Sequence, residues 1–425
     1  MLVAVSAWVS RIIVALVQLA SIRILIDGLG IEHYAIFVLL TGLVGWSLLA
    51  DMGIGISVQN HISESRAARQ SSEDLIYTSA ILAVFLMFLT ILILYFVSPY
   101  VATMLLSKFS SSSELEKTNL FFYTGALSII ASVSGISYKI WYAQQKGYLS
   151  NIVPALGSII GFLCLLVVQE SPVENRLFLS LVSFILPSAC LPLIAMVMQL
   201  INCKLKYSEF AFIATVRKLM TRALRFWLFA LLATAVLQID YIVISQFLNA
   251  SDIAAYYLAT KIFGLAFFVY TAVLSAVWPI FAESLANGEW GSVKRYLKKY
   301  IVAGIIFMLF CTIVLIWSMP KAVQILAPKA NIDIPISLII LLGLYQIIRV
   351  WTDTFTVVLQ SMSYLRPFWV FVPFQVVVNI GLQWFLVPLY GLHGVVFGLI
   401  ASFSLTVGWA LPLSVYKNYK LHQKI

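Results

Sequence analysis

Long apolar stretches separated by short polar segments dominate the chain. Stretches such as 76–97 and 300–317 hold about twenty apolar positions, which is enough to cross a ~30 Å hydrocarbon layer as a helix. The pattern predicts twelve spans and leaves no segment long enough for a soluble domain. The predicted spans are 2–25, 34–59, 76–98, 119–141, 152–169, 177–200, 226–248, 256–281, 299–319, 334–360, 367–387 and 392–416.

The composition agrees with this pattern. Of 425 residues, 62% are hydrophobic and 10% are charged, whereas soluble domains carry about 25% charged residues. The fold class is therefore an all-α integral membrane protein. A soluble enzyme, a secreted disulfide scaffold and a nucleic-acid binder are excluded, and the net charge of +10 bears first on orientation in the bilayer.

Basic residues fall mainly on one side of the predicted spans. With the N-terminus inside, 18 Lys and Arg residues lie in cytoplasmic segments and 5 lie outside, which predicts that both termini are cytoplasmic. The inside set is Arg66, Arg69, Lys139, Lys146, Lys204, Lys206, Arg217, Lys218, Arg222, Arg225, Lys294, Arg295, Lys298, Lys299, Arg366, Lys417, Lys420 and Lys424. The outside set is Lys108, Lys117, Arg176, Lys321 and Lys329.

Short motifs recur between the two halves of the chain. Gln18 and Tyr34 recur as Gln238 and Tyr256, and a Gln-x-x-x-Tyr-Leu motif at 144–149 recurs at 360–365. Because six spans is an even number, such halves are parallel repeats, an arrangement typical of transporters. The predicted organisation is an N-terminal six-helix lobe (1–200), a basic cytoplasmic linker (201–225), a C-terminal six-helix lobe (226–416) and a basic cytoplasmic tail (417–425).

Seven ionisable residues lie inside predicted spans, where charge is costly and usually functional. Four cations are substrate-binding candidates, and three carboxylates are coupling or gating candidates. The excess of cations favours an anionic substrate such as a phosphate or an acidic sugar. The cations are Arg11, Arg23, Lys261 and Arg349, and the carboxylates are Asp51, Asp240 and Asp353.

Each of these residues except Arg11 has a simple structural alternative. Arg349 and Asp353 are four residues apart and can neutralise each other. Asp51 can be hydrated near the membrane interface, and Arg23 can extend to the lipid headgroups. Arg11 lies near mid-span with no carboxylate within one turn, so it is the strongest binding candidate.

Catalytic, nucleotide-binding and metal-binding motifs are not found in the sequence. We therefore expect no cofactor, no metal and no enzymatic activity. Any energy source would be an ion gradient, the membrane potential or the substrate gradient.

Several motifs resemble the bacterial O-antigen flippases, which are Wzx-type polysaccharide transporters of the MATE-like (MOP) superfamily. The similar segments are GIEHYA at 30–35, LADMGIG at 49–55, QNHISESRA at 59–67, QID at 238–240, AYY at 255–257, WPIFAE at 278–283 and VPLYGLHG at 387–394. They extend from the first predicted span to the last. Ala35 departs from the pattern, since many relatives have Gly after the Tyr.

The resemblance implies a function that composition alone does not. Members of this family move undecaprenyl-pyrophosphate-linked oligosaccharide repeat units from the cytoplasmic to the periplasmic leaflet of the inner membrane. Arg23 matches the family's cation near the end of span 1, and Asp51 with Gly53 matches its span-2 motif. Arg11, Lys261 and Arg349 fit its basic cavity by residue type. An O-antigen polymerase and a chain-length regulator are expected neighbours.

Two alternatives remain from the sequence. A cation-coupled multidrug exporter shares the superfamily, but such exporters usually carry cations, which the predicted excess of Lys and Arg disfavours. An O-antigen polymerase-type membrane enzyme is expected to have a large outside loop, whereas the longest outside loops predicted here are 99–118 and 320–333. Alternating access between two lobes is the expected mechanism.

Overall fold

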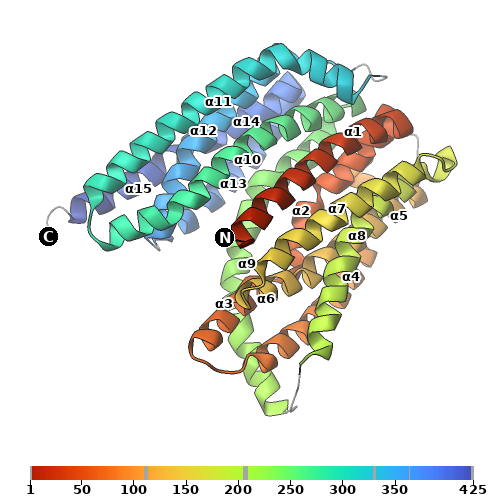
Figure 1. Cartoon of the computed structure of the whole chain (residues 1–425). Helices are drawn as coiled ribbons and strands as arrows, with labels where there is room; N and C mark the ends of the chain where they lie inside the picture. Colours follow the sequence, from red (N-terminus) through yellow and green to blue (C-terminus); the bar gives the residue numbers. More distant parts are fainter. Residues whose placement is uncertain (1, 110–112, 204–208, 329–331, 363, 423–425) are drawn as a thin grey trace. The chain divides into compact units, whose positions relative to one another are not determined.

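The computed structural model describes residues 2–109, 113–203, 209–328, 332–362 and 364–422, and these residues form helices and short connections with no strand (Figure 1). Eleven helical segments in this part of the chain are long and apolar enough to cross a membrane. The protein is thus an all-α, multi-pass membrane protein, as predicted. Lys204, Lys206, Lys329 and Lys424 lie outside the described residues.

The first two predicted spans meet at a kink instead of being joined by a loop. The helix α1 (Leu2–Gly42) consists of two helices that meet at Gly30, so the predicted break between 2–25 and 34–59 is present but is confined to one residue. The apolar segment Val5–Asp51 extends across this kink. Gly30 alone leaves helical geometry, with φ 74° and ψ 173°. Glycine adopts this left-handed region without the steric cost that a Cβ brings. A single residue therefore interrupts the run, which explains eleven helical segments where hydropathy predicts twelve spans.

The chain divides into two compact units inside one helix. Unit 1 is Met1–Thr234 with Leu326–Ala330, and unit 2 is Ala235–Ile325 with Asn331–Ile425. The boundary lies within α9 (Glu209–Phe247), so the predicted linker 201–225 is helical from Glu209 onward. The predicted lobe limits and the parallel repeat stay predictions.

Unit 1 contains α1, α2 (Val44–Ser47), the 3-10 helix η1 (Leu48–Asp51), α3 (Ile54–Ala67), α4 (Glu73–Leu105), α5 (Glu114–Ser134), α6 (Ile136–Ala143), α7 (Gly147–Val168), α8 (Val173–Ile201) and the first part of α9. Here α1 packs along α7, α5 packs against α4 and α8, and α3 packs against α6 (Figure 1).

Unit 2 contains the rest of α9, then α10 (Ala250–Ala286), most of α11 (Trp290–Leu326), α12 (Ile336–Ser361), α13 (Arg366–Tyr390), α14 (Leu392–Leu405) and α15 (Val407–His422). Helix α12 contacts α10, α14 and α15, and α13 pairs with α14. Hydrophobic side chains from these contacts form the interior of the unit. Helix α12 also contributes several of the polar groups described below.

The start of α3 is held by a carboxylate that binds free backbone amides. Oδ1 of Asp51 accepts the N–H of Gly53 at 2.8 Å, and Oδ2 accepts the N–H of Gly55 at 3.2 Å. These donors have no partner within the helix, so the carboxylate acts as a cap. Met52 and Gly53 both adopt left-handed backbone conformations in this turn.

Gly53 also lies where α3 touches α9. A Cβ at Gly53 would lie 2.3 Å from the carbonyl oxygen of Ala223, and its φ is +77°. Leu219 and Ala223 of α9 are fully buried against Ile54, Val58 and other residues of the unit 1 core. The sequence therefore needs glycine at position 53 for both conformation and space.

We predict that Gly53→Ala lowers the free energy of unfolding of the protein. Backbone strain at this position costs about 1–3 kcal/mol, and the displacement of α9 by the added Cβ increases the loss. The measurement is the thermal unfolding midpoint of the purified, detergent-solubilised protein. Gly381→Ala is the matched control, because Gly381 is exposed and an added Cβ there meets no atom within 4 Å. Equal midpoints for the two variants would contradict the prediction.

Candidate functional site

Polar side chains gather in the interior of unit 2. Asp240 on α9 is 8% exposed, and its Oδ2 accepts a hydrogen bond from Tyr256 Oη at 2.6 Å. Its Oδ1 accepts the N–H of Tyr241 at 3.0 Å. Tyr256 on α10 is 1% exposed. A short bond from a phenol to a carboxylate is strong in a low-dielectric interior, so it ties α9 to α10 and offers an acidic site within the membrane-spanning region.

A cation and a carboxylate lie one helical turn apart on α12. Arg349 Nη2 is 3.2 Å from Asp353 Oδ2, and the two side chains are 23% and 29% exposed. The guanidinium carbon of Arg349 lies 4.1 Å from the centroid of the Phe267 ring, a cation–π contact. Tyr345, one turn before Arg349, interacts electrostatically with Arg349, Asp353 and Asp240. The structure thus groups three of the predicted residues around one tyrosine.

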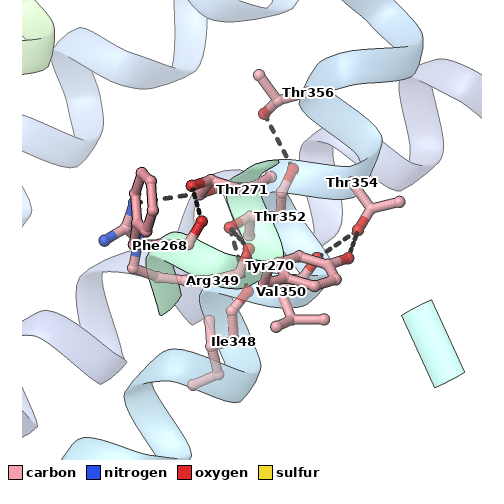
Figure 2. Close-up of polar contacts among 10 residues, drawn as sticks. Phe268, Tyr270, Thr271, Ile348, Arg349, Val350, Thr352, Thr354 and Thr356 are labelled. Carbon is pink, nitrogen blue, oxygen red and sulfur yellow. Dashed lines mark hydrogen bonds and ion pairs between the residues drawn. The ribbon is translucent and has the colours of Figure 1, made fainter. Parts of the chain in front are cut away.

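Hydroxyl groups continue this polar face of α12. Figure 2 shows Tyr270 of α10 reaching Thr354, and the two hydroxyl oxygens are 2.6 Å apart. Thr352, Thr354 and Thr356 each donate to a carbonyl one turn earlier in the helix. Their hydroxyls are thereby satisfied inside the helix, so α12 can carry many polar atoms through an apolar environment.

A row of buried amides follows α13. Gln375, Asn379 and Gln383 are spaced four residues apart and are 3%, 0% and 0% exposed. Asn379 donates to the carbonyl of Val236 at 3.2 Å, and its own oxygen accepts from Gln383 at 2.9 Å and Ser402 at 3.3 Å. Nε2 of Gln375 and Oε1 of Gln383 have no hydrogen-bond partner among the described residues. Such atoms are usual positions for bound water.

The other candidates lie elsewhere. Arg23 is 58% exposed and 3.9 Å from Asp27, and Nζ of Lys261 lies 5.0 Å from the ring centroid of Tyr257. Asp51 caps α3, as described above. A cation one turn from a carboxylate or over a ring has its charge partly compensated.

Arg11 is exposed on α1 and follows a residue that is firmly held. The hydroxyl of Ser10 donates to the main-chain oxygen of Asn151 at 2.6 Å, and the Asn151 amide donates to Val3 O at 3.1 Å and to Ser6 Oγ at 3.0 Å. These contacts join the first turns of α1 to α7, next to Arg11.

Sequence reasoning did not identify Tyr345, Phe267 or the amide row as parts of a site. The amides were visible as a four-residue spacing in an apolar span, which places them on one helix face. The partners of Arg349 and Asp240 on other helices had no such signal, because they are brought together only by packing. Among the described residues, no group of three or more His, Cys, Asp or Glu side chains is placed to hold a metal ion.

The fold is that of the MATE and MurJ transporters of the MOP superfamily. An inward-facing multidrug resistance MATE family transporter superposes with a TM-score of 0.77 at 15% identity, covering 97% of this chain and 96% of that one. The lipid II flippase MurJ in an inward closed conformation superposes with a TM-score of 0.72 at 14% identity, covering 98% and 87%.

Sequence comparison defines the family more narrowly. The family model "Lipid II flippase MurJ" matches residues 57–334. A protein of Yersinia pseudotuberculosis named "Putative O-antigen export protein" is 40% identical, covering 97% of this chain and 95% of its own. A "Putative O-antigen transporter" of Salmonella typhi is 38% identical, covering 99% and 96%. The chain therefore belongs to the MurJ-like flippase family and is similar along its whole length to the O-antigen transporters, which confirms the resemblance seen in its motifs.

We predict that Tyr256→Phe lowers the stability of the protein by about 1–3 kcal/mol, because a buried carboxylate loses its hydrogen-bond donor. Thermal unfolding of the purified protein measures this change. In a double-mutant cycle with Asp240→Asn, the two substitutions are expected to be non-additive, since the residues are in contact.

Tyr390→Phe is the control for this cycle, because Tyr390 is 56% exposed and its hydroxyl makes no hydrogen bond among the described residues. It is expected to unfold at the wild-type temperature. Additive effects of the Tyr256 and Asp240 substitutions would show that their bond does not contribute to stability.

Proposed function

We propose that this protein is a flippase for lipid-linked oligosaccharides. Its substrate is an undecaprenyl-pyrophosphate-linked O-antigen repeat unit, carried from the cytoplasmic to the periplasmic leaflet of the inner membrane. It works by alternating access and catalyses no covalent reaction. The observation that carries this proposal is the 38–40% identity over nearly the whole chain to proteins named for O-antigen export and transport.

The family match supports the lipid-linked nature of the cargo. The matching family is named for a lipid II flippase, and the match covers residues 57–334, which include parts of both units. The fold alone does not distinguish lipid flipping from drug export, because a MATE transporter superposes with a TM-score of 0.77 and the MurJ flippase with 0.72. Full-length sequence similarity is therefore what favours the flippase over the multidrug exporter.

The membrane potential favours the proposed direction of transport. Moving two negative charges outward across an inside-negative membrane yields about 4.6 kcal/mol per 100 mV, at about 2.3 kcal/mol for each charge. A cationic binding site is then required for the pyrophosphate during the crossing. We assign this role to Arg11, Arg23, Lys261 and Arg349, with Arg11 the most important because it lies inside the first predicted span and its side chain is exposed on α1.

Carboxylates are the candidates for ion coupling or gating. Asp240 and Asp353 are favoured by their place in the polar interior of unit 2. Asp51 holds the turn before α3 through its bonds to backbone amides. If Asp51 takes part in gating, it does so by changing the conformation of this turn.

The charge distribution supports the proposed orientation. The excess of Lys and Arg in one set of predicted loops supports placing both termini in the cytoplasm, and the proposed substrate places the protein in the inner membrane. An O-antigen polymerase and a chain-length regulator, which would use the flipped units, are the proposed neighbours in the membrane.

Deletion of the gene, followed by gel analysis of lipopolysaccharide, tests the proposal. We predict loss of all O-units from the lipopolysaccharide core and accumulation of undecaprenyl-linked units on the inner leaflet. Core bearing a single O-unit would instead identify a polymerase. An unchanged ladder with altered drug sensitivity would identify an exporter.

We predict that Arg11→Ala abolishes complementation of the deletion, because the headgroup loses its principal cation, and that Arg11→Lys retains part of it. The measurement is the intensity of the O-unit ladder at matched levels of membrane-inserted protein. Lys321→Ala is the control, since Lys321 is exposed at the end of α11 and has no proposed role. A normal ladder with Arg11→Ala would remove this residue from the site.

A further inference from the structure

We propose that α3 and the first part of α9 form an acid-sensitive latch within unit 1. The latch consists of Gly53, Ser57, His61 and Glu64 on the α3 side and Leu219, Arg222 and Ala223 on α9. It holds the helices together when His61 is neutral and loosens when His61 takes up a proton. This device does not depend on the nature of the transported substrate.

The α3 residues of the latch lie on one helix face. Gly53, Ser57 and His61 follow each other at intervals of four, which places them in a line along the helix. At one end Gly53 brings the α9 backbone close, since a Cβ there would meet Ala223 O at 2.3 Å. In the middle, Ser57 Oγ donates to the carbonyl of Leu219 at 2.9 Å, and Ser57 is fully buried.

An ion pair closes the other end of the latch. Arg222 Nη1 lies 2.6 Å from Glu64 Oε1 and donates a hydrogen bond to it. This bond lowers the pKa of Glu64 below its usual value. The carboxylate therefore stays charged at neutral and mildly acidic pH, so the pH response of the latch has to come from another group.

His61 is that group, because it is buried beside cations. It is 7% exposed, and neither ring nitrogen has a hydrogen-bond partner among the described residues. Nδ1 lies 3.2 Å from Glu64 Oε2, a distance at which the two groups form an ion pair only if His61 is protonated. Burial and the positive charges of Lys218 and Arg222 lower the pKa of His61, and Glu64 opposes them.

The other helices packed against α3 carry a few ionisable groups. Helix α4 begins with Glu73 and Asp74, and α6 carries Lys139. The charges identified as acting on His61 come from Glu64 on its own helix and from Lys218 and Arg222 on α9. Protonation of His61 therefore adds a positive charge to a place that already holds two, and it also competes for the carboxylate that binds Arg222.

The direction of the effect follows from linkage. A histidine whose pKa is lowered in the closed state prefers to be neutral there, so closure is favoured above the usual pKa of about 6.5 and is weakened below it. The latch determines whether the first part of α9 stays fixed to α3. The same helix continues into unit 2. Acidification near this face would release the first part of α9.

Hydrogen–deuterium exchange of the purified full-length protein tests the latch, with exchange rates corrected for the intrinsic effect of pH. Between pH 7.5 and 5.5, we expect exchange in peptides covering 54–67 and 214–227 to accelerate up to about tenfold, as a histidine of ordinary pKa becomes protonated in the opened state. His61→Gln and His61→Leu should abolish the acceleration. His33→Gln should keep it, because His33 lies on α1 with Nδ1 3.3 Å from Leu29 O.

Two results would overturn the proposal. One is a wild-type protein with equal protection of these peptides at both pH values. The other is a wild-type-like acceleration in both His61 variants, since other groups would then cause the opening. The exchange measurement involves no transport, so its outcome is independent of the O-antigen assays.

Discussion

Backbone hydrogen bonding without water is the constraint on which this structure depends. In the hydrocarbon region every N–H and C=O must be satisfied within the protein, which leaves helices as the main solution for this chain. A departure from helix in unit 1, at residues 51–53, is tolerated because Asp51 binds the free amides of Gly53 and Gly55. The residue that seemed a candidate for gating is thus also required for the local fold.

The same constraint applies to the polar side chains of unit 2, which form their hydrogen bonds within the protein. Threonines on α12 bond to their own helix, Asp240 bonds to Tyr256, and Asn379 bonds across to α9. Asp240 and Asn379 thus use their hydrogen bonds to join helices as well as to form part of the candidate site. A substitution at one of them is therefore expected to affect stability and transport together, which is why each transport variant needs a matched measurement of folding.

Hydropathy was sufficient to predict the all-helical membrane fold, because runs of about twenty apolar residues have few alternatives. The polar residues between 26 and 33 were sufficient to predict a break between the first two spans, but not that the break would be confined to Gly30. Among the site residues, the pair Arg349–Asp353 was predictable from its four-residue spacing. The contact of Asp240 with Tyr256 joins two consecutive helices, and that of Glu64 with Arg222 joins residues 158 positions apart in the chain. Both depend on how the helices pack, which the sequence pattern does not reveal.

The most direct test of lipid-linked oligosaccharide flipping is transport by the purified protein in liposomes. Undecaprenyl-pyrophosphate-linked repeat units would be placed in both leaflets, and a membrane-impermeant glycosidase added outside would report which units are accessible. We predict that the accessible fraction rises from about half to nearly all when active protein is present, and that it stays near half with Arg11→Ala. An accessible fraction unchanged by the wild-type protein would contradict the assignment as a flippase.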